Sequence, residues 1–200
     1  MNSFVIRVLD ILFSLIGLLL LAPFFLLVTI WILLDDPGPV FYRQVRVGKR
    51  GKDFLLLKFR SMRVDNGKSL QLTVGSRDPR ITRSGYWLRK FKLDELPQLL
   101  NVLYGSMSIV GPRPEVRKFV EYYTQEQRQV LSVRPGITDE ASIAYANENE
   151  LLAKVADPEK YYIETIMPEK LALNQHFIRN PSVINYLRII GKTMVKVVKN

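Results

Sequence analysis

Residues 11–34, ILFSLIGLLLLAPFFLLVTIWILL, decide how this chain folds. No charged side chain interrupts them, and Asp35-Asp36-Pro37-Gly38-Pro39 ends the run abruptly. A helix needs ~20 apolar residues to cross a bilayer, so the segment is long enough for a membrane helix. A cleaved signal peptide fits poorly, because the run is too long, contains a proline and is followed by no small-residue cleavage site. We therefore predict a membrane anchor over residues 1–36.

Pro23 lies almost at the centre of the apolar run. A proline removes one helical hydrogen bond and clashes with the carbonyl four residues earlier, so a kink is expected there. Hydropathy alone favours an ordinary spanning helix. A sharp bend would instead return the chain to the side from which it entered. The charged flanks, Arg7 and Asp10 before the run and Asp35 and Arg43 after it, are compatible with both topologies.

The remaining residues, 37–200, suffice for one modest domain. The chain carries a net charge of +10 and is basic directly after the apolar run, at Arg43, Arg46, Lys49, Arg50 and Lys52. Such a cluster predicts a domain on the cytoplasmic face of the membrane, beside anionic lipid or phosphorylated substrates. The absence of cysteine excludes disulfides, thiolate nucleophiles and cysteine metal sites. The single histidine, His176, excludes a multi-histidine metal centre.

The pattern of the domain predicts an α+β fold that is mainly helical. Two runs rich in β-branched and aromatic residues, 40–47 and 54–62, flank Gly48-Lys-Arg-Gly51 and predict a small β-hairpin. Lys58 and Arg60 alternate in the second run, so both should project from one face of its strand. Residues 64–77 are polar and predict a loop. Helices are predicted over 84–91, 97–103, 115–131, 148–155, 159–167 and 170–178, and an extended turn over 133–138.

The last stretch of the chain predicts an amphipathic helix. Its apolar residues recur at three- and four-residue spacing, and its basic residues lie largely on the other side. The apolar residues are Ile184, Leu187, Ile190, Met194 and Val198, and the basic ones are Arg188, Lys192, Lys196 and Lys199. Packing on the domain core and contact with a membrane interface fit this pattern equally well.

Residues suited to chemistry are most concentrated in Lys90-Phe-Lys-Leu-Asp-Glu-Leu-Pro-Gln98. Two adjacent acids, Asp94 and Glu95, precede a proline that is suited to opening a helix. A helix start favours phosphate, and carboxylates beside a phosphate are suited to attacking it or to holding a divalent cation against it. The flanking basic residues are Arg89, Lys92 and Arg113. The plainer interpretation is a pair of acids that complements the helix dipole, and such acids are common.

Six short motifs follow one another in order along the chain. They are Gly38-Pro-Val-Phe-Tyr-Arg-Gln44, Lys58-Phe-Arg-Ser-Met62, Asp78-Pro-Arg-Ile-Thr82, Leu93-Asp-Glu-Leu-Pro-Gln98, Gly111-Pro-Arg-Pro114 and Arg134-Pro-Gly-Ile-Thr138. Together with the proline-interrupted apolar segment, they resemble the small monotopic phosphoglycosyl transferases, a family of bacterial sugar transferases. Each motif alone is weak, but six in the right order make the resemblance specific.

The resemblance implies a Mg²⁺-dependent enzyme on the cytoplasmic face of the bacterial inner membrane. It would move a phosphosugar from a nucleotide sugar, expected to be a UDP-sugar, to polyprenyl (undecaprenyl) phosphate. In this family the acid that matches Asp94 is the nucleophile of a ping-pong reaction and becomes covalently bound to the phosphosugar. Glu95 matches the neighbouring catalytic acid, and both acids are expected to hold the Mg²⁺. The resemblance also implies that Ala22-Pro23 breaks the apolar helix into a monotopic, re-entrant hairpin.

A carboxylate that attacks an anionic diphosphate needs cations to screen the repulsion. Arg89 and Arg113 are the strongest candidates for phosphate contacts, and Lys58, Arg60 and Arg134 come next. For each of these residues the alternative is an ordinary solvated surface charge, which describes most lysines and arginines.

The chain departs from the commonest family pattern after Thr138. Ala146 stands where relatives usually carry an arginine, and Asn174 stands near a position that is often acidic. The sugar, the glycan pathway and a homodimeric state are therefore left open. Two rival interpretations are a non-catalytic, membrane-anchored basic module that binds lipid or nucleic acid, and a scaffold that has lost activity. The acid pair argues against both, and against nucleic acid as a partner, because acids beside phosphate weaken such binding.

Overall fold

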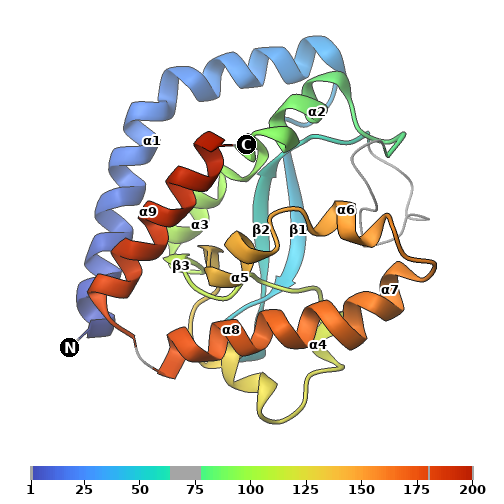
Figure 1. Cartoon of the computed structure of the whole chain (residues 1–200). Coiled ribbons are helices and arrows are strands. Elements are labelled where there is room, and N and C mark those ends of the chain that lie inside the picture. The colour runs from blue at the N-terminus through green and yellow to red at the C-terminus, as the bar shows by residue number, and fades with distance from the viewer. Residues whose placement is uncertain (1, 64–77, 180, 200) are drawn as a thin grey trace.

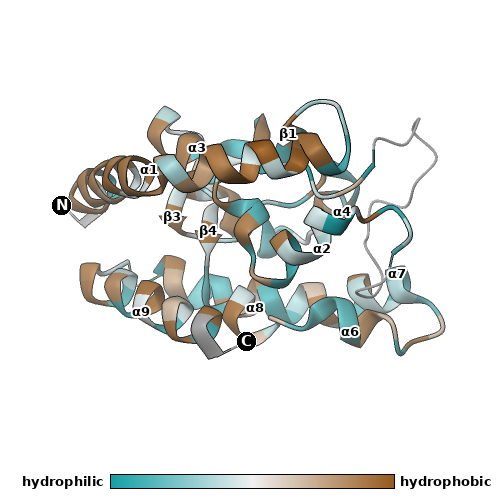
Figure 2. Ribbon diagram, turned by 90° about the horizontal axis from the view of Figure 1, so that it is seen from above, coloured by the Kyte–Doolittle hydropathy of each residue, from teal (hydrophilic) through white to brown (hydrophobic). Residues whose placement is uncertain are grey.

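The computed structural model describes residues 2–63, 78–179 and 181–199. The loop that the sequence predicts over 64–77 lies outside this range. The fold is α+β and mainly helical, as predicted. Seen from above, α1, α3 and the β-hairpin lie along one side and α6, α8 and α9 along the other (Figure 2).

Helix α1 (Asn2–Asp35) bends into two arms that frame two sides of the molecule (Figure 1). Pro23 is the proline inside this helix, and it supplies the physical cause of the bend that the sequence predicts. The first arm packs along α3 (Gln98–Tyr104) and α9 (Val183–Lys199). The second arm packs on α2 (Arg83–Lys90). The domain therefore sits in the concave side of a bent apolar helix.

Polar contacts fasten both ends of α1 to the domain. Near the start, Arg7 donates to the carbonyl of Val102 at 2.8 Å. Asp10 accepts hydrogen bonds from the Ile109 amide at 2.8 Å and from the Tyr186 hydroxyl at 2.9 Å. At the other end, Asp35 accepts from the amide and hydroxyl of Ser84, at 2.7 and 2.8 Å. Since both ends bind one folded body, α1 is part of the domain's architecture as well as an apolar anchor.

The predicted hairpin is confirmed. Strands β1 (Phe41–Val47) and β2 (Asp53–Phe59) pair antiparallel, with Phe41 opposite Phe59 and Val47 opposite Asp53. The turn Lys49–Gly51 joins them, and Gly51 adopts a positive φ of 71° that a glycine takes without strain. The hairpin face that carries Leu56 is buried against α3 and brings β2 to the catalytic loop.

A second, parallel pair of short strands was not predicted. It joins β3 (Ser108–Val110) to β4 (Gly136–Thr138), and the sequence had suggested an extended turn at the latter. Two glycines make the pair close: a Cβ built on Gly136 would lie 2.1 Å from the amide nitrogen of Gly111. The signal in the sequence was therefore the two glycines in Gly111-Pro-Arg-Pro114 and Arg134-Pro-Gly-Ile-Thr138, since both strands are too short for a strand pattern.

The helices of the second half begin and end at other residues than predicted. They are α4 (Arg117–Val120), the 3₁₀ turn Gln127–Ser132, α5 (Glu140–Ala144), α6 (Glu148–Leu152), α7 (Pro158–Tyr161), a π turn at Tyr162–Ile166 and α8 (Met167–Arg179). The single helix predicted over 115–131 is wrong. Thr124 and Gln127 exchange side chain–backbone hydrogen bonds, and this local ring competes with helical bonding. The predicted interruption at Pro168 is wrong: α7, the π turn and α8 form one continuous helical run over 158–179, where two separate helices were predicted.

The core has several parts. The largest packs Phe119, Val130, Tyr162 and Ile166 beneath α8. A second part joins the distal arm of α1 to α2 and β2 through Val28, Ile32, Phe59 and Leu88. In α9, Tyr186 and Ile189 are buried against the first arm of α1, whereas Ile184, Leu187 and Met194 are exposed. The amphipathic C-terminal helix therefore uses part of its apolar surface for the core and leaves another part exposed.

Candidate active site

The two acids lie in a tight loop between α2 and α3. The chain leaves α2, passes through Lys92 in the left-handed region (φ 57°, ψ 20°) and forms a 3₁₀ turn at Leu93–Glu95. Pro97 then leads into α3. The left-handed residue reverses the chain direction, so adjacent acids can point into the domain instead of along a helix surface. The predicted helix boundary after the acids is thus correct, with a 3₁₀ turn inserted before it.

Glu95 is neutralised by two cations from distant parts of the chain. Lys58 Nζ on β2 lies 2.9 Å from Glu95 Oε1. The Arg113 guanidinium forks across the carboxylate: Nη1 lies 3.1 Å from Oε2, and Nη2 binds Oε1. Burial alone would raise the pKa of Glu95, but Arg113 and Lys58 hold it well below its usual range. Glu95 is therefore a fixed anion at all pH values near neutrality.

Asp94 is in a contrasting environment. Its side chain is buried, with 5% of the residue exposed. No residue in the ranges 2–63, 78–179 and 181–199 forms a hydrogen bond or ion pair with it. Burial raises its pKa above the ordinary value, and the adjacent Glu95 charge acts in the same direction, while Lys58, Arg89 and Lys92 pull it down. Asp94 is thus an acid without a direct partner, surrounded by cations that do not contact it.

Asn101 fixes the position of β2 over this loop. Its side-chain oxygen accepts from the Leu57 amide at 2.9 Å, and its side-chain nitrogen donates to the Leu55 carbonyl at 2.8 Å. These bonds replace ladder partners at the edge of the hairpin. They hold Lys58, the next residue along the strand, above the start of α3, where it meets Glu95.

Arg113 is oriented by its own backbone. Its amide donates to Asp139 Oδ2 at 2.9 Å, and prolines on both sides restrict the chain around it. Glu95, together with the nearby charges of Glu148 and Asp139, raises the pKa of Arg113. A guanidinium is always charged in proteins, so this residue is a permanent cation at the site.

The structure brings together five of the residues singled out in the sequence. Lys58, Arg113, Asp94 and Glu95 meet directly or as neighbours, and the charge of Arg89 on α2 acts on Asp94. Arg89 Nη1 also lies 3.9 Å from the sulfur of Met62. Together with Lys92 in the loop itself, these placements put two lysines and two arginines around the acid pair.

Arg60 and Arg134 are placed elsewhere by their contacts. Arg60 is buried, and its Nη1 lies 2.9 Å from the Asp36 carboxylate at the end of α1. Arg134 Nε donates to the Gly105 carbonyl at 2.9 Å. Both side chains therefore support the scaffold around the loop, and a phosphate contact by either stays a prediction.

Sequence reasoning did not single out Asp139 or Glu148 as neighbours of the site. Asp139 caps α5 by accepting from the Ser142 amide while it also holds the Arg113 amide. Glu148 binds Lys170 Nζ at 2.6 Å, and its charge reaches Arg113. The usable signal was Asp139-Glu-Ala-Ser, a cap pattern directly after the last motif.

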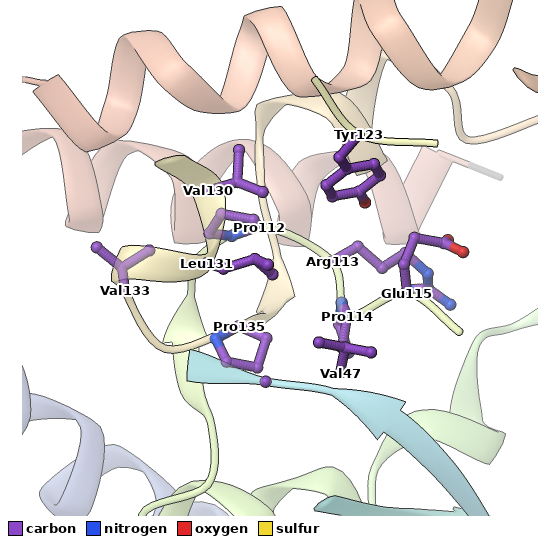
Figure 3. Close-up of a pocket in the computed structure, with 11 residues that line it drawn as sticks. Val47, Pro112, Arg113, Pro114, Glu115, Tyr123, Val130, Leu131, Val133 and Pro135 are labelled. Atoms are coloured by element: carbon purple, nitrogen blue, oxygen red, sulfur yellow. The ribbon is translucent and has the colours of Figure 1, made fainter. Parts of the chain in front are cut away.

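A small cavity lies behind Arg113 (Figure 3). Apolar residues line most of it, among them Val130, Leu131, Val133 and three prolines. The space open to the centre of a water molecule measures about 10 Å³, which is enough for one water and far too small for a sugar nucleotide. The cavity is therefore a packing gap beside Arg113.

The acids fit a Mg²⁺ ion that arrives with a diphosphate. Mg²⁺ is commonly held by one or two carboxylates together with substrate phosphates. Within the described part of the chain there is no cluster of three or more Asp, Glu or His side chains suited to a metal. Asp94 offers a free carboxylate, whereas Lys58 and Arg113 occupy Glu95. These side chains suit a Mg²⁺ ion that is held jointly with a substrate phosphate better than an ion held by protein side chains alone.

Comparison with known proteins identifies the family. The sequence profile described as "Bacterial sugar transferase" matches residues 1–200. The chain belongs to the bacterial sugar transferase family. This sugar transferase is 40% identical over 197 residues to the exopolysaccharide production protein PSS of Rhizobium leguminosarum bv. phaseoli, which covers 94% of this chain and 92% of the relative.

Two further relatives of the sugar transferase have names that state a reaction. A putative undecaprenyl-phosphate N-acetylgalactosaminyl 1-phosphate transferase of Bacillus subtilis is 50% identical over 120 residues, covering 60% of this chain and 67% of the relative. The UDP-glucose:undecaprenyl-phosphate glucose-1-phosphate transferase of Escherichia coli is 36% identical over 199 residues. That match covers 98% of this chain but only 40% of the Escherichia coli protein. A sugar transferase from Xanthomonas campestris is likewise spanned over 38% of its length.

Proposed function

We propose that this sugar transferase moves a phosphosugar from a UDP-sugar to undecaprenyl phosphate, with Asp94 as the covalent nucleophile. The observation that carries the proposal is the contrast between the two acids. Glu95 is held by Lys58 and Arg113, whereas Asp94 is buried without a direct partner beside it. A carboxylate that forms no ion pair keeps its lone pairs for attack. The reactions for which the Bacillus and Escherichia coli relatives are named support the same chemistry.

In the first half-reaction an Asp94 oxygen attacks the phosphorus that bears the sugar. A bond forms between the carboxylate oxygen and that phosphorus, and the bond from this phosphorus to the bridging oxygen breaks. The bridging oxygen leaves with the electron pair as part of UMP. The enzyme then carries a phosphosugar ester on Asp94. The attack uses the ionised carboxylate, which Lys58, Arg89 and Lys92 favour against the effect of burial, so no proton is transferred in the step itself.

In the second half-reaction an oxygen of undecaprenyl phosphate attacks the same phosphorus. The bond to Asp94 breaks and the electron pair returns to the carboxylate, which restores the free enzyme. The product is undecaprenyl diphosphosugar. Because a phosphate monoester is already anionic near pH 7, this step also needs little general-base help, and Glu95 is free to hold Arg113 and Lys58 in place.

The cations supply the electrostatic part of the mechanism. Arg113 and Lys58 bind Glu95 before the donor arrives, so they are already in place and partly desolvated. The charge of Arg89 also acts on Asp94 and favours its ionised form. When bound, Mg²⁺ would neutralise charge on the diphosphate, with Asp94 as the acid that has a free carboxylate for it, because Lys58 and Arg113 already bind Glu95.

The proposed location is the cytoplasmic face of the inner membrane, with α1 re-entering the bilayer. The helix has the length and composition of a membrane-spanning segment over Ser3–Asp35. A straight span would carry its ends to opposite faces. Here Arg7 and Asp10 at one end and Asp35 at the other bind the same domain. A bent, re-entrant helix satisfies both sets of contacts.

Intact-protein mass spectrometry tests the nucleophile directly. Purified enzyme incubated with UDP-sugars and Mg²⁺, without lipid, should gain the mass of one phosphosugar and release UMP. Asp94→Asn should show no adduct and lose turnover by several orders of magnitude. Asp53→Asn, which alters an exposed pair with Arg117, should behave as wild type. An adduct on another residue, or normal turnover in Asp94→Asn, would refute the proposal.

A further inference from the structure

Helix α2 has an exposed aromatic flank that the proposed chemistry does not use. Tyr86, Trp87 and Phe91 are 43%, 45% and 41% exposed. The Trp87 and Phe91 rings stack at 6.0 Å with 12° between their planes, and Tyr86 meets Trp87 edge-on at 5.5 Å. Lys90 Nζ lies 5.1 Å from the Trp87 ring and 5.7 Å from the Phe91 ring. These three rings and the lysine that lies against them form the aromatic flank of α2.

The flank is next to the apolar outer surface of α1. On α2, Ser84 binds Asp35 and Leu88 packs against Val28 and Ile32, so this row of α2 faces the distal arm of α1. Trp87 and Phe91 lie beside that row on the helical wheel. On the distal arm, large apolar residues are exposed at Leu26, Leu27, Ile30, Trp31, Leu33 and Leu34. The two exposed surfaces therefore adjoin.

Helix α2 also separates this flank from the catalytic loop. At ~100° per residue, Arg89 lies about 200° around the helix from Trp87. Arg89 Nη1 contacts the sulfur of Met62 after β2, and its charge acts on Asp94, so the side of α2 that turns away from Trp87 faces the body of the domain, with Tyr86 at its edge. Figure 1 shows α2 directly beneath the distal arm of α1. The helix is thus placed as a spacer between an exposed aromatic surface and the nucleophile.

We propose that the aromatic flank of α2 binds the headgroup boundary of the lipid bilayer and so sets the height of Asp94 relative to the lipid phosphates. Tryptophan and tyrosine are enriched at membrane–water interfaces, where an apolar ring and a polar edge are both satisfied. A lysine stem can lie along the rings while its ammonium reaches the headgroups. Stacking before contact with lipid reduces the side-chain entropy lost on docking.

This inference rests on the proposed membrane location, and the two can be tested separately because the chain has only two tryptophans. Trp31→Phe leaves Trp87 as the sole reporter, and Trp87→Phe leaves Trp31 on α1. Each variant would be reconstituted in phosphatidylethanolamine–phosphatidylglycerol vesicles that contain lipids brominated at a shallow or a deep acyl position. Bromine quenches tryptophan only at close range, so the experiment reports where each ring lies.

Trp87 emission should be largely lost with the shallow bromine, less with the deep one, and protected from aqueous iodide. As a matched control, Tyr122→Trp would be placed in a background that carries both Trp→Phe changes. Tyr122 is 54% exposed and comes directly after α4. Helix α4 lies near the bottom of Figure 1, whereas α2 lies near the top. Its emission should be quenched by iodide and not by bromine.

Quenching of Trp31 without quenching of Trp87 would overturn the inference and leave the proposed function intact. Lack of quenching at both positions would overturn the membrane location as well. If Trp87 is protected from iodide but also from bromine, another protein surface covers it, and the lipid assignment is wrong.

A second readout uses the double variant Trp87→Ser, Phe91→Ser. Transfer of the phosphosugar to the lipid acceptor should slow, while adduct formation from the soluble donor should be unchanged. Slowing of both steps equally would also contradict the proposal.

Discussion

At the scale of single residues, the site depends on two adjacent acids with opposite electrostatics. Lys58 and Arg113 lower the pKa of Glu95, whereas burial raises that of Asp94. A protein that keeps an ionised acid in a buried position gives up stability for reactivity. The two acids therefore make opposite predictions for the free energy of unfolding.

Asp94→Asn should raise the unfolding temperature at pH 7.5. The folded pKa of Asp94 lies above its unfolded value, so the ionised form disfavours folding at high pH and the penalty vanishes below the unfolded pKa of about 3.9. The gain should accordingly shrink as the pH is lowered toward 4, as followed by thermal unfolding in detergent. Wild-type turnover should fall as the pH drops through the same raised pKa. A lower unfolding temperature for Asp94→Asn at pH 7.5 would show that the acid has a stabilising partner.

Glu95→Gln should destabilise the domain by about 3 kcal/mol, because Lys58 and Arg113 would face each other without an anion between them. The contribution of Glu95 is present above its unfolded pKa and is lost as the pH falls through the depressed folded value. Lys58→Met added to Glu95→Gln should cost less than the sum of the single changes. The matched control is Glu126→Gln, an exposed pair with Arg179 that should change stability by less than ~0.5 kcal/mol. Additive losses at Glu95 and Lys58 would contradict the coupling.

At the scale of elements, the approach of α2 to the segment after β2 determines where the catalytic loop lies. Gly85 permits it: a Cβ at this position would lie 1.9 Å from the Ser61 carbonyl oxygen and 2.7 Å from Thr82 Oγ1. The Thr82 hydroxyl caps α2 by accepting from the Gly85 amide at 3.0 Å. Backbone contact therefore limits how closely α2 approaches the segment after β2, in addition to the packing of Leu88 with Phe59.

Gly85→Ala should destabilise the domain by about 3 kcal/mol, since backbone must move to relieve the clash. Gly191→Ala on α9 is the matched comparison, because no atom lies within 4 Å of its added Cβ. That change should stabilise the protein by about 0.5–1 kcal/mol through helix propensity. Chemical denaturation in detergent measures both. Equal effects of the two substitutions would mean that the close approach of α2 does not limit stability.

At the scale of the whole molecule, the bent α1 ties the membrane anchor to the catalytic domain. Arg7 and Asp10 hold one arm, and Asp35 and Asp36 hold the end of the other. In the proposed re-entrant topology, both ends of the helix and the domain lie on the same side of the bilayer. This arrangement makes topology a property of the folded domain as well as of the apolar run.

Cysteine labelling checks this topology, since the natural chain has no cysteine. Ser3→Cys and Gln129→Cys place one thiol at each of two exposed positions, near the start of α1 and on the domain. In intact cells a membrane-impermeant maleimide should label neither, and after permeabilisation it should label both. Labelling of position 3 alone in intact cells would mean an ordinary spanning helix. A parallel experiment with Pro23→Ala, which restores the helical amide, should weaken the contacts of one arm and lower the unfolding temperature.

The sequence by itself determined the apolar anchor segment, the hairpin and the acid pair, because each can be recognised from residues that are neighbours in the chain. An uncharged run of 24 residues, alternating strand residues around Gly48–Gly51, and acids before Pro97 need no distant partner to be recognised. The sequence also placed Arg113 and Lys58 near the chemistry through motifs. It over-extended the helix at 115–131, where a side-chain ring at Thr124 and Gln127 ends it.

Only the tertiary structure decided which charges meet. Lys58, Glu95 and Arg113 come from β2, the loop before α3 and the turn after β3, and their contact depends on packing across the domain. The pairing of β3 with β4 and the hydrogen bond from the Tyr186 hydroxyl to Asp10 both join residues that are far apart in the chain. Ion pairs and burial depend on distances through space, and so do the opposite pKa shifts of Asp94 and Glu95. Two acids that are equivalent in a sequence thus become a buried acid without an ion pair and a fixed anion once the chain has folded.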